Sequence, residues 1–333
     1  MKKIILGLML FTMLGISGQP KYAIKFAALA PKGSTWMNIL DELDASLREK
    51  SNGEFGFIIY PGGVAGDEKK VIRKMRIRQL HAAGLTGVGL GAILPEERIF
   101  DSPFLFRDTT EVDYISNLLF KRFADKFDEK GFVLLGWAEV GFVYVYTKTK
   151  VNSFEDMKEV KMWAWEGDPV ADATFSSLEL HPIPLSITDV ITSLQSGIVD
   201  AVYAPPLAAV AFQWHTRVNY MFDLPIANAM GAVIVDKRSF AKLPEKYQTL
   251  LVEESKIYFA RITAASRHDN ATSIEVMKKK GIEVVKPFSE ADMKRFQESG
   301  KKARRSLVGK LYSAELLDEV ESALEDLRKK GNK

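Results

Sequence analysis

The stretch between Pro244 and Gly281 constrains the fold more than any other part of the chain, because its 36 residues contain neither glycine nor proline. As one helix this stretch would be about 54 Å long, which exceeds the ~30 Å diameter of a small domain. We therefore expect a helix that crosses from one domain to another. The alternative is two shorter helices with a break near His268-Asp269-Asn270. Helical spacing of the apolar residues and a lysine-rich last turn support a helix: Tyr247, Leu250, Leu251, Tyr258, Ile262, Ala265, Lys278, Lys279 and Lys280.

The rest of the chain alternates between β-rich runs and helical stretches, which is typical of mainly parallel sheets covered by helices. Its 333 residues suffice for two domains at ~150 residues each. The sequence therefore predicts a two-domain α/β protein. The runs predicted as strands are Tyr22–Leu29, Phe55–Tyr60, Gly131–Trp137, Phe142–Thr147, Val160–Trp165, Val199–Tyr203 and Ala232–Val235.

Capping residues mark several helix ends. A serine followed three residues later by an acid can cap a first turn, as in Ser153-Phe154-Glu155-Asp156 and Ser186-Ile187-Thr188-Asp189. Gly197 should end the helix that begins at the second of these sites. An apolar stripe predicts a further helix from Trp36 to Arg48, and Asn52-Gly53 should then turn the chain.

The first 18 residues resemble a bacterial secretory signal peptide. Lys2 and Lys3 precede an apolar run from Ile4 to Leu14, and small residues follow up to Gly18, near which we expect cleavage. As a helix this run would span only ~16 Å, about half of the hydrocarbon core of a bilayer. No cysteine is present to carry a lipid. We therefore expect a periplasmic protein.

Composition and motifs exclude several functional classes. The net charge of +3 gives no general electrostatic reason to bind nucleic acid, and the absence of cysteine excludes thiol catalysis and disulfides. The sequence contains no nucleophile elbow, zinc-protease helix, phosphate loop or calcium loop. Its histidines, which are His81, His181, His215 and His268, are scattered. We predict no catalytic residue, no metal and no cofactor, and hence a protein that is not an enzyme.

A run of glycines from Gly84 to Gly91 superficially resembles a nucleotide-binding loop. However, Leu94 stands where the fingerprint requires a final glycine, and the run lies far from the first βα unit. We interpret it as a tight backbone crossing instead.

Tryptophan provides the strongest indication of a ligand site. In the predicted strand Val160–Trp165, alternation places Trp163 and Trp165 on one face and Met162 and Ala164 on the other. Ligands of α/β proteins usually lie in a crevice at strand ends. We therefore expect these two indoles to face a crevice between the domains.

The order and spacing of several short motifs resemble the DctP-type periplasmic solute-binding proteins of TRAP transporters, over nearly the whole chain after the signal peptide. The motifs are Asn52-Gly53, Tyr60-Pro61-Gly62-Gly63, Ser102-Pro103-Phe104-Leu105-Phe106, Ser153-Phe154-Glu155-Asp156-Met157-Lys158, Ile183-Pro184-Leu185 and Gly197-Ile198-Val199-Asp200. The resemblance implies a two-lobed periplasmic-binding-protein fold with mixed, mainly parallel sheets, a ligand cleft between lobes joined by strands and one long helix, and delivery of the ligand to a membrane permease.

Two departures from the family pattern bear on the ligand. Members of the family have an arginine that binds the ligand carboxylate. In this sequence Trp163 stands at the position of that arginine. Ala204 stands where the family commonly has an asparagine. A buried carboxylate would therefore lack its charged partner. We expect an apolar or amphipathic ligand, lipid-like or a hydrophobic acid, between aromatic walls formed by Trp163, Trp165, Tyr203, Trp214, Trp36, Trp137 and Tyr144.

Two alternatives stay open. Another cation could replace the missing arginine, with Lys148, Lys161 and Arg217 as candidates. The protein could also be a sensor or scaffold with a tetratricopeptide-repeat partner, which the resemblance implies for a branch of the family that lacks the arginine.

The expected lobes follow from the resemblance. Lobe I comprises residues 19–143 and about 232–256, and lobe II comprises 144–231 and about 272–315. The long helix covers about 245–280, and a C-terminal helix and tail cover 316–333. We expect the strands Phe142–Thr147 and Ala232–Val235 to cross between the lobes, and the lobes to close over the ligand as hinged bodies.

Overall fold

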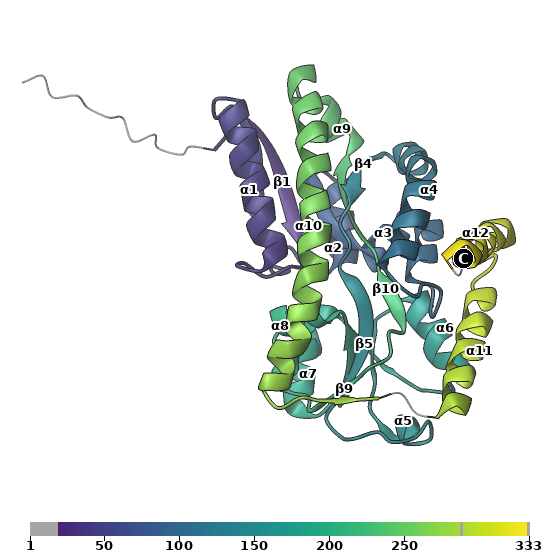
Figure 1. Ribbon diagram of the computed structural model, residues 1–333. Coiled ribbons are helices and arrows are strands. Elements are labelled where there is room, and N and C mark those ends of the chain that lie inside the picture. The colour runs from purple at the N-terminus through teal and green to yellow at the C-terminus, as the bar shows by residue number, and fades with distance from the viewer. Residues whose placement is uncertain (1–18, 287–288, 332–333) are drawn as a thin grey trace, which may run out of the picture.

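The computed structural model describes residues 19–286 and 289–331. The predicted signal peptide, residues 1–18, lies outside the described residues. Two lobes lie one above the other and a single long helix runs along both (Figure 1). Each lobe is built around a mixed five-stranded sheet.

Lobe I is built on a sheet with the strand order β2-β1-β3-β11-β4. The first three strands are parallel, while β11 runs antiparallel to both β3 and β4. Helices cover both faces of the sheet, with α1 and α10 on one side and α2, α4 and α12 on the other. The strands are β1 (Tyr22–Ala28), β2 (Phe55–Tyr60), β3 (Ala82–Thr86), β4 (Phe132–Trp137) and β11 (Gly231–Asp236). The helical segments are α1 (Thr35–Lys50), α2 (Glu68–Arg76), α3 (Gly87–Gly91), η1 (Pro95–Asp101), α4 (Thr109–Glu129), α9 (Lys237–Ala241) and α12 (Ala314–Gly331).

Lobe II is built on the path β10-β5-β9-β12, with β8 also paired to β5, and on a separate parallel pair of β6 and β7. The expected mixed sheets are confirmed, but they are not mainly parallel, because β5 and β11 each run antiparallel to their neighbours. The strands are β5 (Gly141–Thr147), β6 (Trp163–Trp165), β7 (Ile183–Leu185), β8 (Ala201–Ala204), β9 (Tyr220–Phe222), β10 (Ala227–Ala229) and β12 (Glu283–Val285). The helical segments are α5 (Asp156–Glu159), α6 (Pro169–Ser177), η2 (Ile187–Asp189), α7 (Val190–Ser196), α8 (Pro206–Ala211), η3 (Trp214–Thr216) and α11 (Glu290–Ser306).

The predicted helix starts are confirmed only in part, because Ser186 directly precedes η2 but makes no capping bond, and its Oγ donates to Asp67 instead. Ser34 caps α1, whose buried face contains the predicted apolar stripe. The backbone N–H of Asp156 donates to Ser153 Oγ, and Gly197 ends α7 with a left-handed φ of 76°.

The long helix α10 (Glu245–Lys279) is unbroken over 35 residues, so the prediction of a single helix is confirmed. It packs against α1 and β4 in lobe I and against α8 in lobe II. The predicted residues Tyr247, Leu251 and Ile262 are buried on it. A rigid element of ~52 Å therefore belongs to both lobes.

The chain crosses between the lobes at residues 138–140, which join β4 to β5, and at Met230, which joins β10 to β11. The two crossings are hydrogen-bonded to each other, since Ala138 N donates to Gly231 O at 2.7 Å and Val140 N donates to Ala229 O at 3.0 Å. The expectation that the strands Phe142–Thr147 and Ala232–Val235 themselves cross is wrong. Each of these strands pairs within the sheet of one lobe, and the crossing occupies the residues just before it.

The second half of α10 is fixed to the first crossing through Arg267 and Asn270. Arg267 donates to Glu139 Oε2 and also binds Asp113 of α4. Asn270 Nδ2 donates to Val140 O, and Asn270 Oδ1 accepts from Leu207 N of α8, both at 2.8 Å. The same helix turn therefore holds lobe I, lobe II and the chain between them.

Candidate ligand-binding cavity

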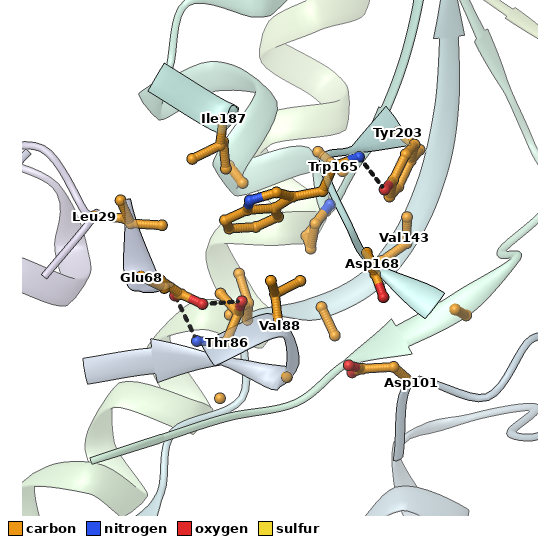
Figure 2. A pocket seen from close by; sticks show the side chains of 18 of the residues that line it. Leu29, Glu68, Thr86, Val88, Asp101, Val143, Trp165, Asp168, Ile187 and Tyr203 are labelled. Carbon is orange, nitrogen blue, oxygen red and sulfur yellow. Dashed lines mark hydrogen bonds between the residues drawn. The ribbon is translucent and has the colours of Figure 1, made fainter. Parts of the chain in front are cut away.

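A cavity of about 210 Å³ lies between the lobes. Lobe I contributes the end of β1, the β3–α3 turn and η1, while lobe II contributes β6, α6, β8 and α8. Figure 2 shows the Trp165 indole near the middle of this lining, among Leu29, Val88 and Ile187. Most of the lining side chains are aliphatic or aromatic.

Trp163 and Trp165 face the cavity from the same side of β6, as the alternation predicts. Trp163 is 1% exposed, stacks on Tyr203 with ring centroids 4.9 Å apart, and meets the edge of Trp214 at 5.2 Å. Its Nε1 donates to Leu185 O at 3.0 Å, so the indole N–H is satisfied within lobe II. Met162 and Ala164 pack instead into the hydrophobic core on the other side of β6.

Trp165 also joins the two lobes. Its Nε1 donates at 3.0 Å to Oδ2 of Asp67, which caps α2 in lobe I. Ser186 Oγ donates to the same oxygen at 3.0 Å. The Trp165 backbone N–H donates to Tyr203 Oη at 3.2 Å (Figure 2). One cavity wall therefore takes part in an interlobe hydrogen bond.

Trp36 lines the cavity from lobe I, where its ring covers Gly84 of β3 so closely that any Cβ at Gly84 would clash with it. A similar close approach occurs at Gly87, where the carboxylate of Asp101 fills the space of a side chain. The glycine run thus makes room for side chains that line the cavity, rather than for another backbone segment.

Two of the predicted wall residues do not line the cavity. Trp137 is half-buried and packs against the core of lobe I, where its ring meets the rings of Phe100, Phe120 and Phe123 edge-on. Tyr144 follows Val143 on β5, and strand alternation directs it away from the cavity that Val143 lines. The sequence correctly placed both on strands, but it did not show which face of the strand met the cavity.

The lining also contains four charged residues that the sequence interpretation missed, which are Glu68, Arg98, Asp101 and Asp168. Arg98 is 4% exposed and pairs with Asp168 through two contacts, Nη1 to Oδ1 at 2.9 Å and Nη2 to Oδ2 at 3.1 Å. Its Nε lies 2.9 Å from Asp101 Oδ2. No sequence motif identified this cluster, because its members lie on three separate elements.

Burial acts on the pKa values of Glu68, Asp101 and Arg98. It raises the pKa of Glu68 to about 8, against the effect of hydrogen bonds from Thr86 N, Thr86 Oγ1 and Gly89 N at 2.7–2.9 Å (Figure 2). It also raises the pKa of Asp101 to about 6, although Arg98 opposes this shift. Burial disfavours the charge on Arg98, but Asp168 and Asp101 outweigh it and raise the pKa of the guanidinium. Near neutral pH the lining therefore carries no net positive charge.

The candidate replacement cations do not line the cavity. Lys148 Nζ donates to Leu194 O at 2.6 Å and pairs with Asp200, and Lys161 Nζ donates to Gly197 O at 3.1 Å. Arg217 is exposed at the end of η3. Among the described lining residues Arg98 is the one cation, and it is already paired.

Two lobes, interlobe crossings and a lined cavity between them define a two-lobed solute receptor of the periplasmic-binding-protein type. The family described as bacterial extracellular solute-binding protein, family 7 (DctP), matches residues 26–310, and the chain belongs to it. Members of this family are solute-binding receptors of TRAP transporters, not enzymes, and deliver small-molecule ligands to a membrane permease.

Individual relatives are distant in sequence. A solute-binding protein of Verminephrobacter eiseniae is 24% identical over 76% of each chain. The sialic acid-binding periplasmic protein SiaP of Vibrio cholerae is 22% identical over 86% of this chain and 91% of its own length. The sugar acid-binding protein DctPAm of Advenella mimigardefordensis, solved in complex with galactonate, superposes with a TM-score of 0.86 at 20% identity, over 92% of this chain and 99% of its own. At these identities the structural likeness shows the fold alone.

No helix within residues 19–286 and 289–331 has both the length and the apolar character needed to cross a membrane.

Proposed function

We propose that this receptor binds an apolar or amphipathic molecule rather than a small dicarboxylate or sugar acid, and presents it to its permease with the lobes closed. The observation that carries the proposal is the cavity lining. Trp36, Trp163, Trp165, Tyr203 and Trp214 surround a space whose one described cation is already neutralised by two aspartates. We infer that these five aromatic residues contact the ligand.

Burial of apolar surface can supply the affinity. Removing ~300 Å² of apolar ligand surface from water at ~25 cal/mol/Å² yields about 7 kcal/mol before the costs of association. A receptor of this kind needs no ion pair with its ligand.

A small carboxylate would meet an unfavourable electrostatic environment in the same cavity. It would lie near Asp101 and Asp168, and Trp163 stands where the family has its carboxylate-binding arginine. Like charges at short range in a buried site disfavour binding, and the desolvation of the ligand carboxylate would go uncompensated. The acids named for relatives of this chain are therefore the second candidate class of ligand.

The test is native mass spectrometry of the protein purified from a periplasmic extract, followed by solvent extraction and identification of whatever it retained. This experiment needs no assumption about the ligand. We expect an excess mass that organic solvent releases and that corresponds to a lipid-like or other apolar molecule. An unliganded mass, with thermal stabilisation by simple organic acids, would contradict the proposal.

A further inference from the structure

The Arg98–Asp168 pair crosses the cavity from one lobe to the other. Arg98 lies on η1 of lobe I, while Asp168 is the residue that caps α6 of lobe II. Both side chains are almost fully buried, at 4% and 6% exposure, and both line the cavity. Figure 2 shows the carboxylates of Asp101 and Asp168 turned toward the same space.

The geometry of the pair is that of a bound carboxylate. Two nitrogens of the guanidinium face two oxygens of one carboxylate at 2.9 and 3.1 Å, which is the bidentate arrangement by which arginine holds carboxylate ligands. Asp101 lies on the Nε side of the guanidinium. The end formed by Nη1 and Nη2 is therefore left to Asp168. Asp101 is held by the second interlobe crossing, because Met230 N donates to its Oδ1 at 3.1 Å.

We propose that Asp168 is a specificity-determining residue that acts as a built-in carboxylate: it occupies the binding end of Arg98 and thereby excludes acidic ligands. This inference rests on the proposed function, since it explains how a cavity that contains an arginine can prefer an uncharged or apolar ligand. Its chemical consequence is specific. Removing the negative charge of residue 168 should turn Arg98 into a receptor for a monocarboxylate whose apolar part lies against the tryptophans.

Local structure allows the substitution to be made cleanly. Asp168 Oδ1 accepts a hydrogen bond from Val170 N at 3.0 Å, and asparagine and serine are both good N-cap residues. Asp168→Asn and Asp168→Ser should therefore keep the start of α6 while removing the charge. Asp172 on the same helix is exposed, so Asp172→Asn is a control with the same change in net charge.

The experiment compares benzoate with benzamide, which have the same ring but differ in charge. Isothermal titration calorimetry would measure both with the wild type, D168N, D168S and D172N, after solvent extraction of retained ligand and refolding. We expect D168N and D168S to bind benzoate about tenfold tighter than the wild type, or more, with little change for benzamide. D172N should match the wild type, and Arg98→Met in the D168N background should abolish the gain.

Several results would overturn the inference. The first is that folded D168N and D168S proteins bind benzoate no better than the wild type does, and the second is that the wild type already binds benzoate as tightly as we expect of the variants. The third is that both variants fail to fold, because the Arg98–Asp168 pair would then be needed for the stability of the fold and would not be a replaceable ligand mimic. The proposed function is judged separately by the molecule extracted from the wild type. An apolar extract without a gain in D168N contradicts only the role of Asp168, whereas a small acid in the extract contradicts the proposed function itself.

Discussion

Replacing Trp165 with phenylalanine should shift the receptor toward an open form. The substitution keeps an aromatic ring in the cavity wall but removes the Nε1–H that donates to Asp67 across the lobes at 3.0 Å. Hydrogen bonds to charged groups contribute about 1.5–3 kcal/mol. Asp67 keeps its bonds from Ser186 and from the backbone of Lys69, so no buried acceptor is left unpaired and the lower figure applies. About 1.5 kcal/mol corresponds to a change of roughly tenfold in the ratio of closed to open molecules.

The absence of cysteine makes the assay direct, because two introduced cysteines can be spin-labelled without a background. Val64 of lobe I and Ile198 of lobe II are exposed at 73% and 51% and suit the labels. Pulsed electron paramagnetic resonance would give the distance distribution between them, and calorimetry the affinity for the extracted ligand. We expect a larger open population in W165F and an affinity reduced by up to the same tenfold factor.

Trp163→Phe is the matched control. It removes an indole N–H bond of the same length, but that bond joins Trp163 to Leu185 within lobe II. The interlobe role of Trp165 Nε1 is refuted if W165F has the distance distribution and affinity of the wild type, or if W163F shifts the lobes as far as W165F does.

Three further predictions concern stability, all measured by urea unfolding. Because burial raises the pKa of Glu68 to about 8, the folded protein holds a proton that the unfolded chain releases near pH 4.5. Its stability should therefore fall as pH rises between these values, and Glu68→Gln should flatten that slope; an unchanged slope would contradict the assignment. Asn270→Ala should lower the free energy of unfolding by about 1–3 kcal/mol, because it leaves Val140 O and Leu207 N without their partner. The exposed Thr272→Ala serves as its control. Gly197→Ala should cost about 1 kcal/mol through its positive φ alone, since no atom lies within 4 Å of the added methyl, and a loss of several kcal/mol would point to a different cause.

Local signals in the sequence were sufficient for much of the fold. The absence of glycine and proline from residues 245–280 predicted α10, and the alternation in Trp163-Ala164-Trp165 predicted which side chains share the cavity face. Such features depend on the preferences of neighbouring residues, which a sequence displays directly.

The elements that the sequence did not predict are those that tertiary contacts define. β3 (Ala82–Thr86) consists largely of small residues, and it is a strand because β1 and β11 pair with it on both sides. The strands β7, β9, β10 and β12 have only three residues each, too few to show a period.

The charged residues of the cavity could not be predicted from the sequence for a related reason. Arg98 and Asp168 are 70 residues apart, and nothing in either local sequence indicates that one completes the other. Comparison with the family pattern showed that Trp163 replaces a charged residue. It could not show that Arg98 lies in the cavity, because Arg98 belongs to none of the aligned motifs. Long-range ion pairs of this kind become apparent only once the lobes are placed together.

The attachment of Arg267 and Asn270 to the first crossing has a mechanical consequence. A helix that is fixed at one turn to both lobes can act as a pivot, and we expect the lobes to rotate about that turn rather than slide past each other. The permease would then distinguish only the angle between the two lobes, whichever ligand had produced that angle. Substitutions in the cavity could then change the ligand without altering the surface that contacts the permease. In this way a receptor family can diversify its ligands while keeping its partner.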